Sequence, residues 1–335
     1  MILIVALNPA LDITHHVDGV DWVSVNRPSA VHVRPGGKGL NVAAVLRTLG
    51  GDVHLLGFAG GHAGDVLAGE LSAADVPADF TRIAGETRRT FAVVDTRRDE
   101  TAIFNEPGPV VSGAEYATFL ACYAEALPGS AVVVLAGSLP PGLPSGTYAD
   151  LITMAARAEV PALLDTSGDA LLAGVAAGPA VVKPNAAELL AALGRGGPWP
   201  GSGQSGQHLP MATRNSQSGD RPPLRVMADA ASELRDRGAD SVVVTLGADG
   251  VLAVTADGTW LARSKPVAGN PTGAGDAAAA GLAYGLVHGY SWAARLAHAA
   301  ALGAAAVAAP VAGQVSLAAY ERALGEVEVQ SWERS

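Results

Sequence analysis

The chain has 335 residues, of which 49% are hydrophobic and 16% charged, so it is long and apolar enough to bury a large core. Its 32 acidic and 22 basic side chains give a net charge of −10, which excludes a general nucleic-acid binder because such a protein needs a basic surface. The single cysteine excludes an intrachain disulfide and fits a reducing compartment.

Continuous apolar runs alternate with helical segments along the chain. The first run, ILIVAL at 2–7, lacks the basic start of a signal peptide and predicts a buried strand. No apolar run reaches the roughly 20 residues of a bilayer span, and we expect a cytoplasmic protein without a membrane partner. The alternation predicts a doubly wound α/β fold with a mostly parallel sheet between helices. Further strands are predicted at 53–58, 131–137, 161–165, 180–184 and 241–247, and helices around 37–49, 62–74, 112–127, 145–158, 185–193, 225–238, 273–288 and 291–308.

Two pairs of short runs break this rhythm, because no helical segment separates the members of either pair. The runs at 13–20 and 30–34, and those at 90–95 and 100–104, alternate polar and apolar residues as antiparallel strands do. They predict a small accessory sheet that could act as a lid or as a dimer surface. Residues 194–223, rich in Gly, Ser, Gln and Pro, predict a mobile insertion within the core.

The run NPTGAGD, at 270–276, opens the predicted helix 273–288. A helix that starts in a glycine turn presents unpaired amides and the positive end of its dipole, which suits an anion. Asp276 places a negative charge where that anion should lie, which is reasonable if the carboxylate accepts a proton during a reaction. A purely structural turn explains the same residues, but the run follows the last sheet strands, near the strand ends where α/β proteins bind ligands.

The run PGGKGLN, at 35–41, precedes the helix at 37–49. Its glycines allow close backbone approach, and Lys38 and Asn41 lie one helical turn apart on the same side. The run matches neither the Walker A loop nor GxGxxG, so a Rossmann dinucleotide site is poorly supported. A glycine turn with a solvated lysine remains open, although lysine is rare in this chain, at 38, 183 and 265 only.

The run KPNAAELL starts at 183, where a predicted strand gives way to a helix. Asn185 and Glu188 have the spacing of a capping box, which is the structural alternative to a role around Mg²⁺. Arg88 and Arg89 precede an accessory strand, so only one of them should face a cleft, where its planar fork would suit a phosphate. Two solvated arginines are the alternative.

Other catalytic classes find little support in the sequence. The eight histidines show no HxxxH or HExxH spacing, which with one cysteine argues against a structural zinc site. No GxSxG elbow is present, so Ser138, before a proline pair, is better read as a hydroxyl presented to a ligand than as a nucleophile.

Taken together, these runs resemble the ribokinase-like, or PfkB, carbohydrate kinases. The resemblance rests on four motifs in order: GGKGLNVAAVLRTLGG (36–51), KPNAAEL (183–189), VVVTLGADG (242–250) and NPTGAGDAAAAGL (270–282). Outside the insertion it covers nearly the whole chain. It implies a three-layer α/β/α fold with a β-sheet lid: 1–11, 35–87 and 107–330 would form the core, and 12–34 and 88–106 the lid.

Within that family, four further runs resemble the phosphosugar branch, which includes 1-phosphofructokinase and tagatose-6-phosphate kinase. They are ALNPALD (6–12), the GGKG form of the first motif, NEPGP (105–109) and GSLPPGLP (137–144). The resemblance implies ATP- and Mg²⁺-dependent phosphorylation of a ketohexose phosphate, with fructose 1-phosphate leading and fructose 6-phosphate or tagatose 6-phosphate as alternatives. It also implies a homodimer through the lid. A catalytically silent sugar-phosphate sensor is the alternative from another class.

The resemblance implies a role for each motif residue. Asp276 would be the base, with the amides of Gly273, Ala274 and Gly275 holding the transferred phosphoryl group. Asp12, Gly36, Gly37 and Asn41 would bind the acceptor sugar, and Lys38, Arg88 and Ser138 its phosphate, with Arg89 in reserve. Lys183, Asn185, Thr245, Gly247 and Gly250 would line the ATP site, and Asn185 and Glu188 would organise water around Mg²⁺.

Overall fold

The computed structural model describes residues 1–195, 223–309, 311 and 313–332. Its larger sheet has ten described strands in the order β14-β13-β12-β11-β10-β9-β8-β1-β4-β5. The strands from β11 to β5 are parallel, and β12, β13 and β14 continue the sheet antiparallel. The strands are β1 (Ile2–Ala6), β4 (Val53–Ala59), β5 (Ala78–Arg82), β8 (Val132–Ala136), β9 (Ala162–Asp165), β10 (Val181–Val182), β11 (Val242–Thr245), β12 (Val251–Thr255), β13 (Gly258–Arg263) and β14 (Glu328–Ser331).

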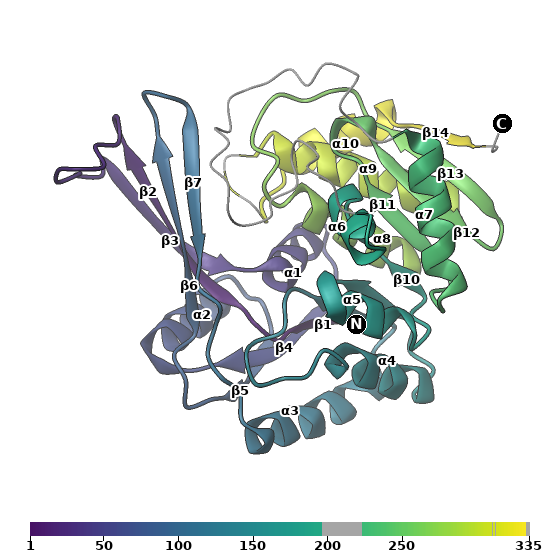
Figure 1. Cartoon of the computed structure of the whole chain (residues 1–335), viewed down its shortest axis with the longest axis horizontal. Helices are drawn as coiled ribbons and strands as arrows, with labels where there is room; N and C mark the ends of the chain where they lie inside the picture. The colour runs from purple at the N-terminus through teal and green to yellow at the C-terminus, as the bar shows by residue number, and fades with distance from the viewer. Residues whose placement is uncertain (196–222, 310, 312, 333–335) are drawn as a thin grey trace.

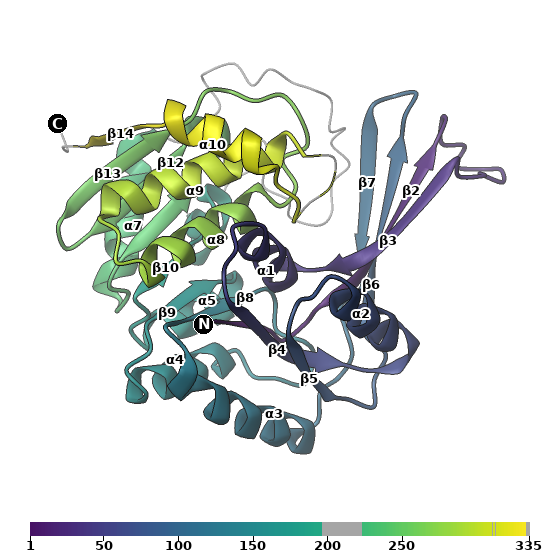
Figure 2. The same ribbon diagram turned by 180° about the vertical axis from the view of Figure 1, so that it is seen from behind.

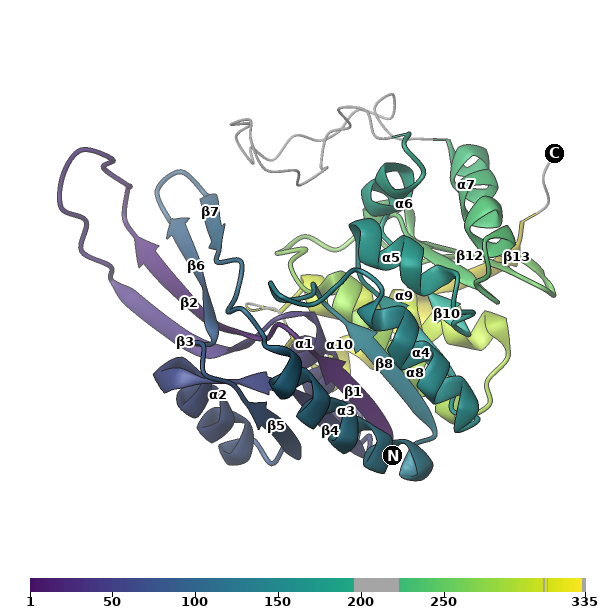
Figure 3. The same ribbon diagram turned by 60° about the horizontal axis from the view of Figure 1, so that its bottom comes forward.

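Helices cover both faces of this sheet. Figure 2 shows one helical layer and Figure 3 brings forward helices of the other. The first layer contains α1 (Lys38–Thr48), α2 (Gly61–Ala73), α8 (Ala274–Val287), α9 (Trp292–Val307) and α10 (Leu317–Glu326). The second contains α3 (Gly113–Ala126), α4 (Thr147–Arg157), α5 (Gly168–Val175), α6 (Ala186–Ala192) and α7 (Leu224–Asp236).

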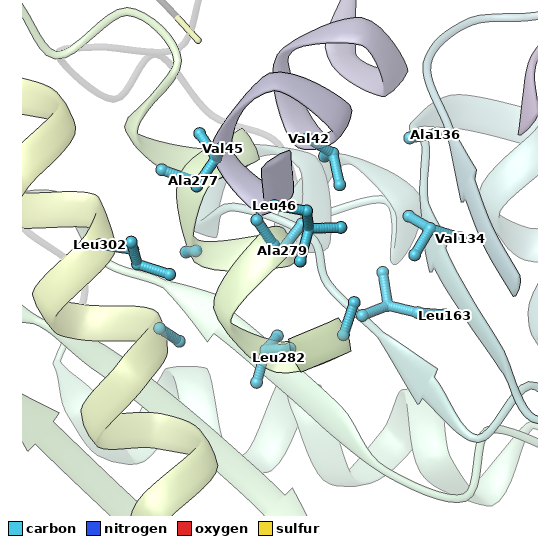
Figure 4. Close-up of a cluster of buried hydrophobic side chains, with 14 of the residues drawn as sticks. Val42, Val45, Leu46, Val134, Ala136, Leu163, Ala277, Ala279, Leu282 and Leu302 are labelled. Carbon is cyan, nitrogen blue, oxygen red and sulfur yellow. The ribbon is translucent and has the colours of Figure 1, made fainter. Parts of the chain in front are cut away.

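The strands are apolar on both faces because each face meets a helical layer. In β1, Ile4 packs into the cluster under α1, α8 and α9, while Val5 packs into the cluster under α3 and α4. Successive strand side chains point to opposite faces, so a continuous apolar run is what this arrangement needs. Figure 4 shows the first cluster, with Ala279 of α8 lying close to Leu46 of α1. The small side chains of α8 let it pack closely among its neighbours.

A second sheet has the strand order β3-β2-β6-β7 and extends away from the larger sheet (Figure 1). We call it the accessory sheet; its strands are β2 (Ala10–Val17), β3 (Ala30–Gly36), β6 (Arg88–Asp95) and β7 (Glu100–Asn105). Residues directly opposite one another across the strands share a face. One row joins Asp12, Arg34 and Thr90, and the next row, on the opposite face, joins Ile13, Val33, Phe91 and Phe104. The sheet therefore has a polar and an apolar face.

The predicted α/β fold with a mostly parallel sheet and a small second sheet is confirmed, but several elements were not predicted: β5, α5, β12, β13, β14 and α10. The two predicted antiparallel pairs are present as β2–β3 and β6–β7, and the two hairpins join through a parallel pairing of β2 with β6. Most of the predicted insertion at 194–223 lies outside the described residues. Among the residues that the structure describes, no helix is both long and apolar enough to cross a membrane.

Candidate active site

The candidate site lies where the parallel strands of the larger sheet end. Asp165 is the last residue of β9, and Asn8, Ser138 and Lys183 follow the ends of β1, β8 and β10. Because parallel strands end at the same edge, they bring together side chains that lie far apart in the sequence. α1 and α8 also begin at this edge, since Lys38 contacts Asp165 and the α1 residue Asn41 contacts Asp276.

Asp276 lies in the first turn of α8, which is capped by Gly273 in the left-handed conformation (φ 83°). Its side chain is buried and Oδ2 accepts a hydrogen bond of 2.7 Å from Asn41 Nδ2. No side chain caps this helix end, so the amides of the first turn remain the natural ligands for an anion. The amide of Ala274 donates to the carbonyl of Pro271 at 3.1 Å, so Gly273 and Gly275 are the better amide donors of the predicted three.

Burial, and to a smaller extent the nearby Asp165 carboxylate, raise the pKa of Asp276 to about 6. Lys38, Asn41 and Lys183 act in the opposite direction by stabilising the ionised form. A carboxylate with a pKa near neutrality is a more effective proton acceptor than one at its ordinary value, and it is still ionised at pH 7.

Two lysines share Asp165 beneath this helix end. Lys38 Nζ lies 2.9 Å from Asp165 Oδ1 and 3.2 Å from Glu188 Oε1, and Lys183 Nζ lies 3.0 Å from Asp165 Oδ2. Burial opposes the ionisation of Asp165 and of Lys38. The two lysines nevertheless lower the pKa of Asp165, and the carboxylates of Asp165, Glu188 and Asp276 raise the pKa of Lys38. The network therefore carries fixed charge of both signs.

This network changes the sequence interpretation in two ways. Asp165 was not predicted, although its signal was present: a lone carboxylate ends the buried run PALLD, and a buried charge needs a partner. Lys38 was grouped with Arg88 and Ser138, whereas its ammonium group contacts Glu188, a residue assigned to the nucleotide side. The reason is that the first turn of α1 lies beside the end of β9, where Asp165 attracts it.

Asn185 and Glu188 form the capping box that their spacing indicates. Asn185 Oδ1 accepts from the Glu188 amide at 2.8 Å, and Glu188 Oε2 accepts from the Asn185 amide at 2.9 Å. Across the described ranges, no group of three or more His, Cys, Asp or Glu side chains is arranged to hold a metal ion. Because Asn185 Oδ1 and both carboxylate oxygens of Glu188 already have partners in the chain, this donor set would suit only a magnesium ion that keeps most of its water and is carried by a ligand's phosphates.

The polar face of the accessory sheet brings Asp12 to the same site. Arg34 Nη2 donates to Asp12 Oδ2 at 2.9 Å. A Cβ on Gly36 would stand 2.1 Å from the Asp12 carboxylate, so Gly36 is required for this side chain to lie against the backbone. Burial raises the pKa of Asp12, while Arg34 and Arg88 act to lower it. Gly37, which precedes α1, has a φ of 96°.

Arg88 and Ser138 lie around Asn8, at the junction of the accessory sheet and the core. Arg88 Nε donates to the Asn8 carbonyl at 3.0 Å, and Asn8 Nδ2 donates to Ser138 Oγ at 3.1 Å. Asn8 was not predicted as a site residue, although it lies in the quoted run ALNPALD. A cavity of about 460 Å³ adjoins this junction, and Arg88 and Arg89 are among the residues that line it. Arg89 extends over Phe91 on the apolar face, so Arg88 is the arginine on the Asp12 side.

The predicted nucleotide residues divide into two groups. Thr245, at the end of β11, forms a β-bridge with Asn185, which places it beside the capping box. Gly247 follows and has open space where a Cβ would stand. Gly250 is explained by packing instead, since a Cβ there would lie 2.1 Å from the carbonyl oxygen of Ala262. Its φ of 102° also favours a glycine, so packing and backbone conformation together account for this residue.

Comparison with known proteins agrees with this arrangement. The model of the pfkB family of carbohydrate kinases matches residues 5–317. A structure of phosphofructokinase-2 from Escherichia coli in complex with potassium is 27% identical over 97% of this chain and 98% of that one, with a TM-score of 0.84. A possible 1-phosphofructokinase from Thermotoga maritima is 26% identical over 99% of both chains, with a TM-score of 0.82.

A carboxylate with a raised pKa at an open helix start, two lysines beneath it and a polar accessory sheet opposite are what a phosphotransferase with an alcohol acceptor needs. The family match across almost the whole chain shows that this protein belongs to the pfkB family of carbohydrate kinases.

Proposed function

We propose that the chain transfers the γ-phosphoryl group of ATP to a hydroxyl of a phosphorylated ketohexose, with fructose 1-phosphate as the leading substrate and fructose 1,6-bisphosphate as its product. The observation that carries this proposal is the placement of Asp276 at the start of α8, buried and hydrogen bonded to Asn41. Fructose 6-phosphate and tagatose 6-phosphate are the alternative acceptors, because all three present a phosphate and several hydroxyls to the same groups.

Asp276 acts as the general base on the acceptor hydroxyl. An aspartate is a weak base toward an alcohol in the ground state, so the proton moves late, as the oxygen bonds to phosphorus. Before that, the carboxylate orients the hydroxyl. The amides of Gly273 and Gly275 stabilise charge on the transferred group, and Lys183, whose Nζ is 3.6 Å from where a Cβ on Gly275 would lie, adds a positive charge.

The acceptor sugar lies between the accessory sheet and the core. Asp12 and Asn41 bind its hydroxyls beside the Gly36–Gly37 turn, while Arg88 and Ser138 bind the phosphate it already carries. The guanidinium fork of Arg88 suits a phosphate because it donates parallel hydrogen bonds. Arg88 already lies near the carboxylates of Asp12 and Glu106. A phosphate on the sugar would give its guanidinium group a bound anion as well, which favours a phosphorylated substrate.

The nucleotide lies on the other side of Asp276, along Thr245 and Gly247. Magnesium bound to the ATP phosphates would supply charge neutralisation there, held through water by Asn185 and Glu188. Lys38 connects the two sides, since its ammonium group contacts Glu188 while its helix also carries Asn41. We infer that Lys38 contacts the migrating phosphoryl group more closely than the phosphate already on the sugar.

An assay of ADP release tests this proposal with fructose 1-phosphate, fructose 6-phosphate, tagatose 6-phosphate and unphosphorylated fructose in parallel. We expect the highest kcat/KM with fructose 1-phosphate and the lowest with fructose. A higher kcat/KM with either other phosphate would change the substrate assignment. No ADP release with any phosphosugar, together with measurable phosphosugar binding by calorimetry, would support a silent sensor instead.

We also propose that residues 12–34 and 88–106 close over the sugar as a lid, and that the apolar face of the accessory sheet joins two copies in a homodimer. Val33 and Phe104 on this face are 46% and 53% exposed and lie in the same row across the sheet, so the face presents large apolar side chains together. The substitution Phe104→Asp should convert the dimer to a monomer in sedimentation analysis. The control Val110→Asp, at an exposed residue outside the accessory sheet, should leave the dimer intact.

A further inference from the structure

Arg34 occupies a position that links the accessory sheet to the catalytic carboxylate. It lies on β3, directly opposite Asp12 on β2, and β3 runs into α1 through Gly36 and Gly37. Arg34 is therefore held by the accessory sheet before the Gly36–Gly37 turn, while Asn41 is held by helix α1 of the core after that turn. No motif considered in the sequence assigns Arg34 a role.

The hydrogen bonds of Arg34 extend in two directions. Nη2 donates to Asp12 Oδ2 at 2.9 Å, and Nη1 donates to Asn41 Oδ1 at 3.2 Å. Asn41 in turn donates from Nδ2 to Asp276 Oδ2 at 2.7 Å. Arg34 thus reaches the catalytic carboxylate through one intervening side chain.

The chemistry of the amide makes this chain directional. An arginine only donates hydrogen bonds, so it must meet the carbonyl oxygen of Asn41 and not the amide nitrogen. That requirement turns Nδ2 toward Asp276. If the amide were rotated by half a turn, its oxygen would face the Asp276 carboxylate and its donor would face the guanidinium group, and both contacts would be repulsive.

We propose that Arg34 is a positioning residue for the reaction: it fixes the amide of Asn41 so that this amide donates its hydrogen bond to the Asp276 carboxylate. The proposal rests on the proposed kinase function, which makes Asp276 the base. Its consequence is that the base is oriented correctly only when β3 of the accessory sheet stands in place beside α1.

The ionisation of Asp276 gives a direct measure of this role. The groups that act on its carboxylate are Asp165 from β9, Lys38 and Asn41 from α1, and Lys183 after β10; the contact from Asn41 favours the ionised form. Replacing Arg34 by methionine removes both donors and frees the amide to rotate. The pKa of Asp276 should then rise by about one unit, because a hydrogen bond to the charged form is lost.

The first experiment measures kcat against pH at saturating sugar phosphate and MgATP for wild type, Arg34→Met, Arg34→Lys and Arg97→Met. Arg97, which pairs with Asp18 on the accessory sheet, is the matched control. The acid limb should move up by about one pH unit in Arg34→Met, by less in Arg34→Lys, and not at all in Arg97→Met. A raised KM for the sugar phosphate with an unmoved acid limb would show instead that Arg34 only binds substrate, and would overturn the proposal.

The second experiment does not depend on activity. The carboxyl carbon of Asp276 is titrated by NMR in protein labelled with ¹³C-aspartate, its signal being assigned by its loss in Asp276→Asn. The titration midpoint should be higher in Arg34→Met than in wild type, and an unchanged midpoint would overturn the proposal. If Arg34→Met does not fold, the titration is repeated with Arg34→Ala, which also removes both donors, and an unchanged midpoint in that variant would overturn the proposal. If wild type phosphorylates no sugar phosphate, the proposed function fails while this titration still tests the link.

Discussion

The substitution Asp276→Asn should produce an enzyme that is more stable than wild type and almost inactive. The asparagine has the same shape and its oxygen can still accept the hydrogen bond from Asn41, so packing is preserved. The substitution removes a charge, because the buried wild-type carboxylate is ionised when the pH is above its pKa of about 6. Removing that charge removes the penalty of burying it.

The magnitude follows from the raised pKa. An increase from 3.8 to about 6 means that the folded chain holds this proton more tightly than the unfolded chain does. The destabilisation is therefore complete above the folded pKa and disappears as the pH falls toward 3.8. We expect Asp276→Asn to be more stable than wild type by about 1 to 3 kcal/mol at pH 7.5 and to lose this advantage near pH 4.

Urea unfolding at both pH values measures the stability, and ADP release measures the turnover. Turnover should fall by a factor of about 10² to 10⁴, as expected for loss of a general base. The matched control is Asp165→Asn, a second buried carboxylate at the same edge whose pKa is lowered by its lysine partners despite its burial. It should destabilise the fold by about 3 to 5 kcal/mol, because Lys183, 3% exposed, would lose its partner.

The stability and the turnover of Asp276→Asn test two different properties of the carboxylate, its burial as an ion and its action as a base. If Asp276→Asn unfolds more easily than wild type at pH 7.5, the carboxylate is not buried in its ionised form. If its turnover stays within tenfold of wild type, Asp276 is not the base. Wild-type turnover should also decline below about pH 6, as the base takes up its proton.

Three further substitutions test the two sides of the site. Arg88→Met should raise KM for the sugar phosphate at least tenfold with little effect on KM for ATP, and equal effects would contradict its placement. Lys38→Met should raise both KM values and lower kcat, because its ammonium group contacts Glu188; an effect confined to the sugar phosphate would restore the sequence prediction. Gly36→Ala should raise KM for the sugar phosphate, since its Cβ would displace Asp12, and unchanged kinetics would contradict that role.

Local sequence determined much of this protein. Unbroken Val, Leu and Ile runs predicted the strands of a sheet covered on both faces, and the spacing of Asn185 and Glu188 predicted the capping box that the structure contains. The order of four short motifs indicated the family. Such features depend on residues close together in the chain, so they can be read without knowing the fold. β5 has only five residues and α10 ten, and both were missed because elements this short depend largely on packing against neighbouring elements.

Only the tertiary structure decided which charges meet. Asp165 contacts Lys38 across 127 positions in the sequence, and Asn41 contacts Asp276 across 235, because the ends of parallel strands and the starts of two helices converge at one edge. The same convergence buries Asp276 and brings Arg34 of the accessory sheet to Asn41. A charge depends on its distance from other charges and on its exposure to water, and the fold alone sets both.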